Sequence, residues 1–219
     1  MKNLSILIPT TGVRHLYLNR ILFILNDQII NNSIQDKIEV VVFKDNFENT
    51  IGFKRNKLLS LSTGKFTCFV DDDDIIHQNY CKTMNDIIEV ENDIQHIGFK
   101  VKVFIDGKRR IDAFHSIKYR GWYQNSLGYY RQTTTLNPIL SSISKQFIFP
   151  EKNNAEDKEW VDKIIRSGLL LKEHYIDDYM YEYLYNNRTS LSFVRRDVNK
   201  GNQKIDWNPR NIDIGVIYL

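Results

Sequence analysis

Hydrophobic and polar positions in the first third of the chain form two alternating patterns. Short, continuous apolar runs at residues 4–8, 38–43 and 65–70 predict buried strands. Between them, residues 13–30 and 51–63 carry apolar side chains at the three- and four-residue spacing of an amphipathic helix. The order strand, helix, strand, helix, strand predicts a parallel sheet with helices on both faces.

The pattern changes after a helix predicted over residues 77–92. Apolar segments at residues 97–105 and 109–114 flank Asp106-Gly107, a pair typical of a two-residue hairpin turn. Antiparallel strands are therefore expected to join the sheet. Residues 116–132 are rich in Tyr, Trp, Arg and Gly without clear periodicity, and we expect a functional loop there.

Two more helices and a strand are predicted further along. Asn137 and Pro138 are expected to open a helix that runs to about Phe147, because Asn is a favoured N-cap and Pro suits the first helical turn. A second helix is expected from residue 154 to 168, followed by a strand at residues 169–176.

These elements predict the α/β fold class. We expect one Rossmann-like domain over residues 1–194, with a mostly parallel central sheet, helices on both faces and added antiparallel strands. Residues 195–219 are polar, and we assign them to a C-terminal tail or wrapping segment.

Composition narrows the class of protein. Of 219 residues, 42% are hydrophobic and 26% charged, with 10 Gly and 4 Pro, which excludes a disordered or collagen-like chain. The formal charge of +3 is too small to require a nucleic acid, so nucleic acid is not an expected partner. Two cysteines, Cys68 and Cys81, are too few for a disulfide framework, and we expect both to be reduced. The sequence contains neither a signal-peptide core nor an apolar stretch of about 18 residues, and a cytoplasmic protein without a transmembrane segment is expected.

The candidate chemistry gathers after the first three strands. In open α/β sheets ligands bind beyond the carboxyl ends of the strands, where this chain has Pro9-Thr10, Lys44-Asp45 and the four carboxylates Asp71 to Asp74. Four adjacent carboxylates repel one another, and Mg²⁺ or Mn²⁺ is the natural cation to offset them. An extended chain would point Asp71 and Asp73 to one side. The plain alternative is a solvated turn before a helix.

Four motifs in order carry a resemblance to a known family. They are LSILIPT, VVVFKDN, GFKRNKLLSLSTGKFTCFVDDDD and NAEDKEW. Together they resemble the GT-A nucleotide-sugar glycosyltransferases, most closely the inverting family 2 type, over about residues 4–190. The resemblance implies a nucleotide-binding half at residues 1–92 and an acceptor-binding, catalytic half at residues 93–194.

The resemblance also implies roles for single residues of the first half. Pro9 and Thr10 would border the nucleobase, Asp45 would accept a hydrogen bond from the base or ribose, and Arg55 would lie near the base and diphosphate. In the Asp-x-Asp motif, Asp71 would contact the nucleotide and Asp73 would be the principal metal ligand. Asp72 is kept among the nucleotide-binding residues, because a slip of one position would put Asp72 and Asp74 in these two roles.

The pair Glu156-Asp157 resembles the acidic pair that supplies the catalytic base. Asp157, the second member, would deprotonate the acceptor hydroxyl. The simpler interpretation is that acidic residues in a first helical turn complement the helix dipole.

Four further residues are weaker candidates. Asn137 lies in a segment that shapes the sugar pocket in the resembled family, and Trp160 and Trp122 are candidate platforms for a sugar. His174 is a possible further metal ligand, although a lone His is more often structural.

The expected function is a metal-dependent, inverting glycosyltransferase that uses Mn²⁺ or Mg²⁺ and a nucleotide-diphosphate sugar, with a UDP-hexose favoured. The acceptor would be a glycan or another hydroxyl compound. One alternative is a sugar nucleotidyltransferase, although residues 9–14 are too poor in Gly for a phosphate-binding loop. The other is a carbohydrate- or cation-binding module without turnover.

Overall fold

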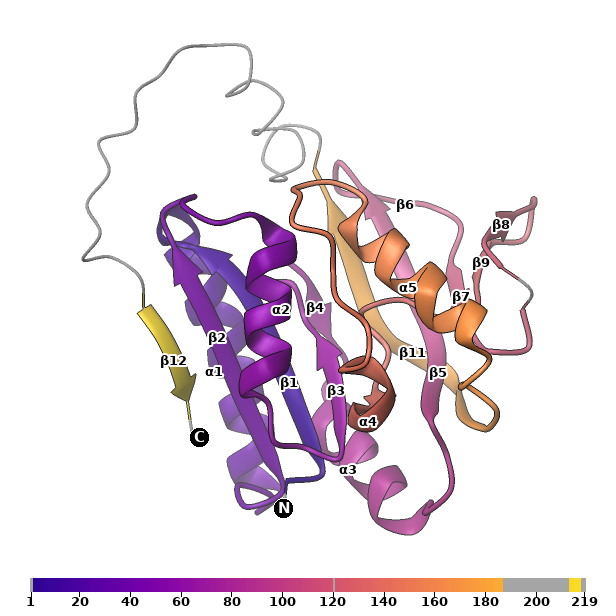
Figure 1. Ribbon diagram of the computed structural model, residues 1–219, viewed down its shortest axis with the longest axis horizontal. Helices are drawn as coiled ribbons and strands as arrows, with labels where there is room; N and C mark the ends of the chain where they lie inside the picture. The colour runs from indigo at the N-terminus through magenta and orange to yellow at the C-terminus, as the bar shows by residue number, and fades with distance from the viewer. Residues whose placement is uncertain (1, 120, 187–212, 218–219) are drawn as a thin grey trace.

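The centre of the protein is a three-stranded parallel sheet. A computed structural model describes residues 2–119, 121–186 and 213–217. In it, β1 (Leu4–Thr11) lies between β2 (Ile38–Asp45) and β3 (Phe66–Phe69), with Leu4 opposite both Ile38 and Phe66. The three strands therefore end at one edge of the sheet (Figure 1).

Antiparallel strands extend this centre on both sides. β10 (Ile139–Leu140) pairs antiparallel with β3 and with β5 (His96–Ile105), and β11 (Glu173–Tyr185) runs parallel to β5. The remaining short strands in the described part are β4 (Ile75–Ile76) on β11, β6 (Lys108–Arg109) and β7 (Ala113–His115) on β5, β9 (Tyr129–Arg131) on β7, and β8 (Tyr123–Gln124) on β9. The result is the expected mixed sheet with a parallel centre.

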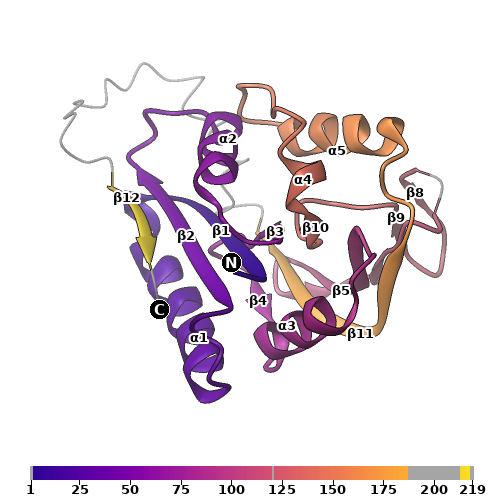
Figure 2. The same ribbon diagram turned by 60° about the horizontal axis from the view of Figure 1, so that its bottom comes forward.

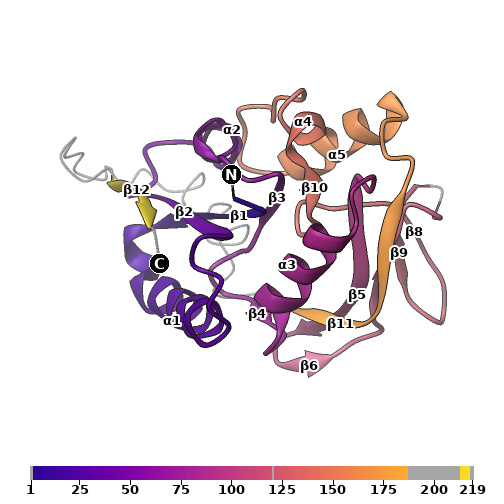
Figure 3. The ribbon, with the colours of Figure 1, turned by 90° about the horizontal axis from the view of Figure 1, so that it is seen from below.

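Helices cover both faces of the sheet. α1 (His15–Asn31), which follows the 3-10 turn η1 (Gly12–Arg14), and α3 (Tyr80–Val90) lie on one face. α2 (Ile51–Leu61), the short α4 (Ser141–Ser144) and α5 (Glu156–Ser167) lie on the other, as Figures 2 and 3 show. Alternate residues of β1 serve the two faces, since Ile6 packs in the cluster with α1 and α3 while Leu7 packs with α2 and α5.

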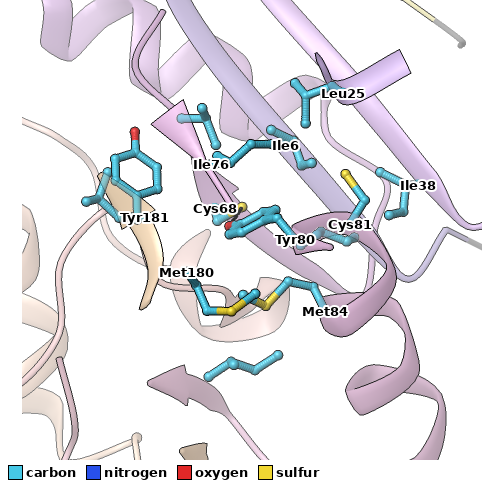
Figure 4. Packing of buried hydrophobic residues seen from close by; sticks show 14 of the residues in the cluster. Ile6, Leu25, Ile38, Cys68, Ile76, Tyr80, Cys81, Met84, Met180 and Tyr181 are labelled. Carbon is cyan, nitrogen blue, oxygen red and sulfur yellow. Dashed lines mark hydrogen bonds between the residues drawn. The ribbon is translucent and has the colours of Figure 1, made fainter. Parts of the chain in front are cut away.

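The larger core cluster joins β1, α1, α3 and the second half of the chain (Figure 4). Tyr80 and Met84 of α3 are fully buried there beside Ile6, and Met180 of β11 is buried in the same cluster. Cys68 and Cys81 are buried and free, as the sequence predicts. Because β11 belongs to the second half of the chain, side chains from both halves pack together in this cluster.

Several predicted elements have different limits. The hairpin at Asp106-Gly107 is confirmed, and both residues have the positive φ that such a turn requires. The helix predicted from Asn137 to Phe147 is wrong for most of its length, because Ile139–Leu140 joins β3 and β5 as β10 and only α4 is helical. Tertiary pairing overrides the local capping signal there.

The end of the chain returns to the sheet. β12 (Asp213–Ile217) pairs antiparallel with β2 at the edge of the sheet. The expected boundary at residue 194 lies outside the described residues and stays a prediction. Among the described residues, no helix combines the length and the apolar character that crossing a bilayer requires.

Asp45, expected in the ligand crevice, is buried inside the fold. Its carboxylate forms an ion pair with Lys54 of α2, and both side chains are almost completely shielded from solvent. The same carboxylate accepts hydrogen bonds from the backbone N–H of Phe47 (3.2 Å) and Asn49 (2.9 Å), while the Lys54 ammonium also donates to the Thr10 carbonyl (2.8 Å). This pair joins the ends of β1 and β2 to α2. Asp45 is thus placed to stabilise the sheet edge, and its carboxylate does not face solvent in this structure.

We predict that Asp45→Ala destabilises the protein by about 3–5 kcal/mol, because it leaves the Lys54 charge buried without its carboxylate partner. Denaturant unfolding measures the loss, and adding Lys54→Met should recover a large part of it. A single variant as stable as the wild type would show that Asp45 is hydrated and open to ligands.

Candidate active site

The acidic segment after β3 is a turn. The Asp74 N–H donates to the Asp71 carbonyl (3.2 Å), so the segment is not the extended chain expected from the sequence. The turn nevertheless sorts the four carboxylates into two pairs. Asp72 and Asp74 are buried, whereas the side chains of Asp71 and Asp73 are 34% and 25% exposed.

Arg14, at the end of η1, supplies the positive charge that the turn needs. Its guanidinium donates to the Asp72 carboxylate at 2.6–3.0 Å and also contacts the Asp73 carboxylate at 2.7 Å. The Thr10 hydroxyl donates to Asp72 as well, and Arg20 of α1 donates to the carbonyls of Asp73 (2.7 Å) and Asp74 (2.9 Å). Asp72 is thus committed to the protein and is not available for the predicted nucleotide contact. A guanidinium offsets part of the charge that the sequence analysis assigned to a metal.

Asp74 ties the turn to β11. Its carboxylate accepts hydrogen bonds from the Tyr181 hydroxyl (2.8 Å) and the Leu184 N–H (2.7 Å). Burial and the neighbouring carboxylates raise the pKa of Asp74 well above its usual value. Asp74 is therefore a structural residue, and the register with Asp71 and Asp73 on the open side is the one that the turn presents.

Arg55 of α2 connects the two predicted acidic motifs. Its guanidinium lies 3.4 Å from Asp71 and 3.4 Å from Glu156, above the ring of Phe69. The third nitrogen, Nη1, is buried and has no hydrogen-bond partner among the described residues. Burial raises the pKa of Glu156, although Arg55 opposes this shift. Glu156 thus pairs with Arg55, which itself pairs with Asp71.

The start of α5 places Asp157 next to this group. The loop that precedes α5 packs closely against Gly52 of α2, since a Cβ on Gly52 would lie 1.9 Å from the Pro150 carbonyl oxygen. Ala155, directly before the helix, has a left-handed backbone with φ +58°, a conformation that costs roughly 1–2 kcal/mol for a residue with a Cβ. The helix therefore begins abruptly, with Glu156 buried and Asp157 lining a cavity.

The cavity has a volume of about 380 Å³, and its lining residues fall into three groups. One end is formed by Arg55, Asp71, Asp157 and Tyr183. The apolar lining comes from Val101, Val103, Ile105, Ala113 and Leu136, and the remaining wall from His115, Trp122, Tyr129, Arg131, Thr134 and Thr135. The end of β3, the start of α5 and the expected loop at residues 116–132 thus meet around one space.

Two residues predicted to lie in the sugar pocket are not brought to this cavity. Trp160 is buried in the core, where it stacks on Phe149 at 4.5 Å and donates to the Phe147 carbonyl. Asn137 is buried, accepts from the Thr134 N–H and donates to the Ile97 carbonyl, so its amide holds a turn. Neither side chain therefore lines this cavity.

His174 lies at the other end of β11. Its Nδ1 atom lies 3.2 Å from a carboxylate oxygen of Glu91. His174 precedes Leu184, the residue whose N–H donates to Asp74, by ten positions, which is roughly 30 Å along an extended strand. It is too far away to share a metal with Asp73. Pro9 and Thr10 are buried within β1, so their side chains do not line the cavity either.

Sequence reasoning missed Arg14, Tyr183, His115 and Arg131. Arg14 lies three residues after the end of the first strand, which is a position where a partner for the acidic run could have been sought. Tyr183 and Arg131 lie in aromatic-rich segments whose position in the fold no local pattern reveals. Trp122, which was predicted, does line the cavity.

Asp71 and Asp73 are the residues that fit a metal ion. Among the described residues, no group of three or more His, Cys, Asp or Glu side chains forms a metal site alone. Burial raises the pKa of Asp71, and the negative charge of Asp73 adds to the shift, so a cation between them would relieve repulsion. Two carboxylates leave coordination positions for substrate oxygens, which is the usual arrangement for Mg²⁺.

Comparisons with known proteins identify the fold. No protein-family model and no curated protein sequence matches the chain. Among solved structures, S. aureus TarS (residues 1–349) in complex with UDP superposes with a TM-score of 0.61 at 19% identity, covering 85% of this chain and 61% of that one. The same fragment with UDP-GlcNAc gives a TM-score of 0.55 at 19% identity, with coverages of 84% and 58%.

A second protein has the same architecture. The catalytic domain of Drosophila beta1,4galactosyltransferase 7 in complex with xylobiose superposes with a TM-score of 0.53 at 12% identity, covering 94% of this chain and 82% of that one. These similarities show that the chain has the GT-A fold. They also show that it spans less than two thirds of the TarS fragment.

His115 provides a test of the cavity wall. The pKa of His115 is lowered from 6.5 to about 3, mainly by burial and to a smaller extent by the neighbouring His96 and Arg131 side chains. The neutral ring therefore stabilises the fold above pH 6.5, and this contribution is lost as the pH falls toward 3.

We predict that the wild type loses about 2 kcal/mol more stability than His115→Gln between pH 7.5 and pH 5, since one pKa unit corresponds to about 1.4 kcal/mol. Urea unfolding of both proteins at each pH measures the difference. Equal losses would mean that His115 is protonated in the fold at its ordinary pKa.

Proposed function

We propose that the protein is an inverting glycosyltransferase that moves a sugar from a UDP-sugar to an acceptor hydroxyl. The observation that carries the proposal is the meeting of Asp71, Arg55 and Asp157 in one cavity at the carboxyl ends of the parallel strands of a GT-A fold. Two similar structures are complexes with UDP and UDP-GlcNAc, which favours a uridine nucleotide as the donor.

The donor diphosphate would lie beside Arg55 and the acidic turn. Arg55 Nη1 is a buried donor without a partner among the described residues, and a phosphate oxygen would satisfy it. The Tyr183 hydroxyl is a second donor at this end of the cavity, and burial and the nearby carboxylates raise its pKa, which keeps it protonated. Both groups can therefore hold the leaving group in position.

Asp71 and Asp73 would hold Mn²⁺ or Mg²⁺ together with the diphosphate. When bound, the ion supplies positive charge that stabilises the departing UDP. Arg14 holds one oxygen of Asp73, and the other oxygen makes no hydrogen bond to the described residues. This arrangement fixes the direction of the Asp73 carboxylate and leaves it an atom for coordination.

Asp157 would act as the general base. The acceptor oxygen forms a bond to the anomeric carbon of the donor, the bond from that carbon to the diphosphate oxygen breaks with its electron pair, and Asp157 takes the hydroxyl proton. A direct attack from the face opposite the diphosphate inverts the anomeric carbon. Glu156 has a different task, since it pairs with Arg55 and positions that side chain.

One prediction of the proposed function concerns the base. Asp157→Asn should lower the transfer rate by about 10²–10⁴-fold while leaving UDP binding unchanged, because the amide keeps the size of the side chain but takes no proton. The measurement is UDP release from a panel of UDP-sugars with candidate acceptors, alongside UDP binding by calorimetry. The matched variant Glu156→Gln should instead weaken UDP binding through Arg55. Normal transfer by Asp157→Asn would remove the assignment.

Another prediction of the proposed function concerns the metal. UDP binding by the wild type should weaken in EDTA, and Asp73→Ala should remove both this dependence and most of the affinity. Titration calorimetry with Mn²⁺ and with EDTA measures both effects, with Asp36→Ala, an exposed carboxylate of the same charge, as control. Equal UDP affinity of the wild type in the two buffers would refute metal binding at the turn.

UDP release that requires an acceptor separates this function from its alternatives. A sugar nucleotidyltransferase would release pyrophosphate from UTP and a sugar phosphate, and a binding module would release nothing. Either result, with no acceptor-dependent UDP release across the panel, would replace the proposal.

A further inference from the structure

Arg131 is a cation in the cavity wall that has no carboxylate partner in the described part of the chain. It lies at the end of β9, and its Nη1 donates only to the backbone carbonyls of Tyr123 (3.2 Å) and Tyr130 (3.0 Å). No carboxylate of the described residues pairs with it. Burial lowers the pKa of Arg131, which reflects a charge that is partly desolvated without compensation. An arginine normally remains charged even so.

The other arginine of the cavity shows the contrast. Arg55 is shared between Asp71 and Glu156, so its charge is matched within the protein. His115, which lines the same wall as Arg131, is neutral because burial lowers its pKa to about 3. Among the described residues, Arg131 is therefore the charged side chain of this wall, and no carboxylate of the protein offsets its charge there.

Aromatic contacts place Arg131 on the side of the proposed base. Its guanidinium lies 4.8 Å from the centre of the Trp122 ring, and Lys158, the residue after Asp157, has its ammonium 5.9 Å from the same ring. Asp71 and Arg55, beside which the donor diphosphate is proposed to bind, come from the end of β3 and from α2, whereas Arg131 belongs to β9. A group held by Arg131 would thus belong to the acceptor.

We propose that Arg131 binds an anionic group of the acceptor, a carboxylate or a phosphate attached to a sugar. This inference rests on the proposed function and specifies the acceptor as acidic. The planar guanidinium matches both oxyanions with paired hydrogen bonds, and its stacking on Trp122 holds it in one orientation. The apolar lining of Val101, Val103 and Leu136 would contact the sugar ring.

The test compares acidic and neutral probes on the full chain saturated with UDP and Mg²⁺, which is diamagnetic and leaves the probe signals sharp. Glucuronate and glucose 6-phosphate represent the two oxyanions, and glucose is the neutral probe. Ligand-observed NMR titration should show at least one acidic probe binding about 10-fold or more tightly than glucose, as expected for a charge-assisted hydrogen bond. The tighter of the two acidic probes identifies the oxyanion.

Three variants locate the effect. Arg131→Gln should abolish the preference for the acidic probe, Arg131→Lys should keep part of it, and Arg110→Gln, an exposed arginine outside the cavity, should keep all of it. The retained affinity for glucose in Arg131→Gln shows that the cavity is intact.

Two results would overturn the inference. One is equal binding of acidic and neutral probes by the wild type, and the other is a loss of UDP affinity in Arg131→Gln, which would assign Arg131 to the donor. Failure of the wild type to bind UDP would instead refute the proposed function, and it is measured separately from the probe preference.

Discussion

The ion pairs of Arg14 with Asp72 and Asp73 are the constraint on which the site depends. Four consecutive carboxylates at the end of a buried strand would repel one another and stay in water. The positive charge of Arg14 reduces this repulsion by pairing with two of the carboxylates. Arg20 holds the backbone of the same turn by donating to two of its carbonyls. Asp72 is buried as a result, Asp74 is buried against Tyr181 and Leu184 of β11, and Asp71 and Asp73 face the open side.

Arg55 extends the same principle to the second half of the chain. Arg55 contacts both Asp71, just after β3, and Glu156, at the start of α5. Arg55 and Glu156 are 101 positions apart in the sequence. Adjacent carboxylates thereby acquire different tasks, since Glu156 is committed to Arg55 and Asp157 lines the cavity. Arg131 differs from these residues, because among the described residues its guanidinium pairs with backbone carbonyls and with no carboxylate.

Local sequence patterns were sufficient for most of the fold. The apolar runs of β1, β2 and β3 and the spacing in α1 and α2 determine a parallel sheet with covered faces, because burial on both faces demands those patterns. The hairpin at Asp106-Gly107 is equally local, since it depends on two residues that tolerate positive φ. The segment at Asn137 shows the limit, because pairing with β3 and β5 overrides its helix signal.

The sequence by itself determined which residue types the site would contain, namely the acidic run after β3 and the pair Glu156-Asp157. Only the tertiary structure decided which of them face a ligand. Exposure of a carboxylate depends on partners far away in the sequence, such as Arg14 for Asp72, Lys54 for Asp45 and Arg55 for Glu156. The tertiary structure also placed Arg131 in the cavity and Trp160 in the core, because charge pairing and packing are properties of the folded chain.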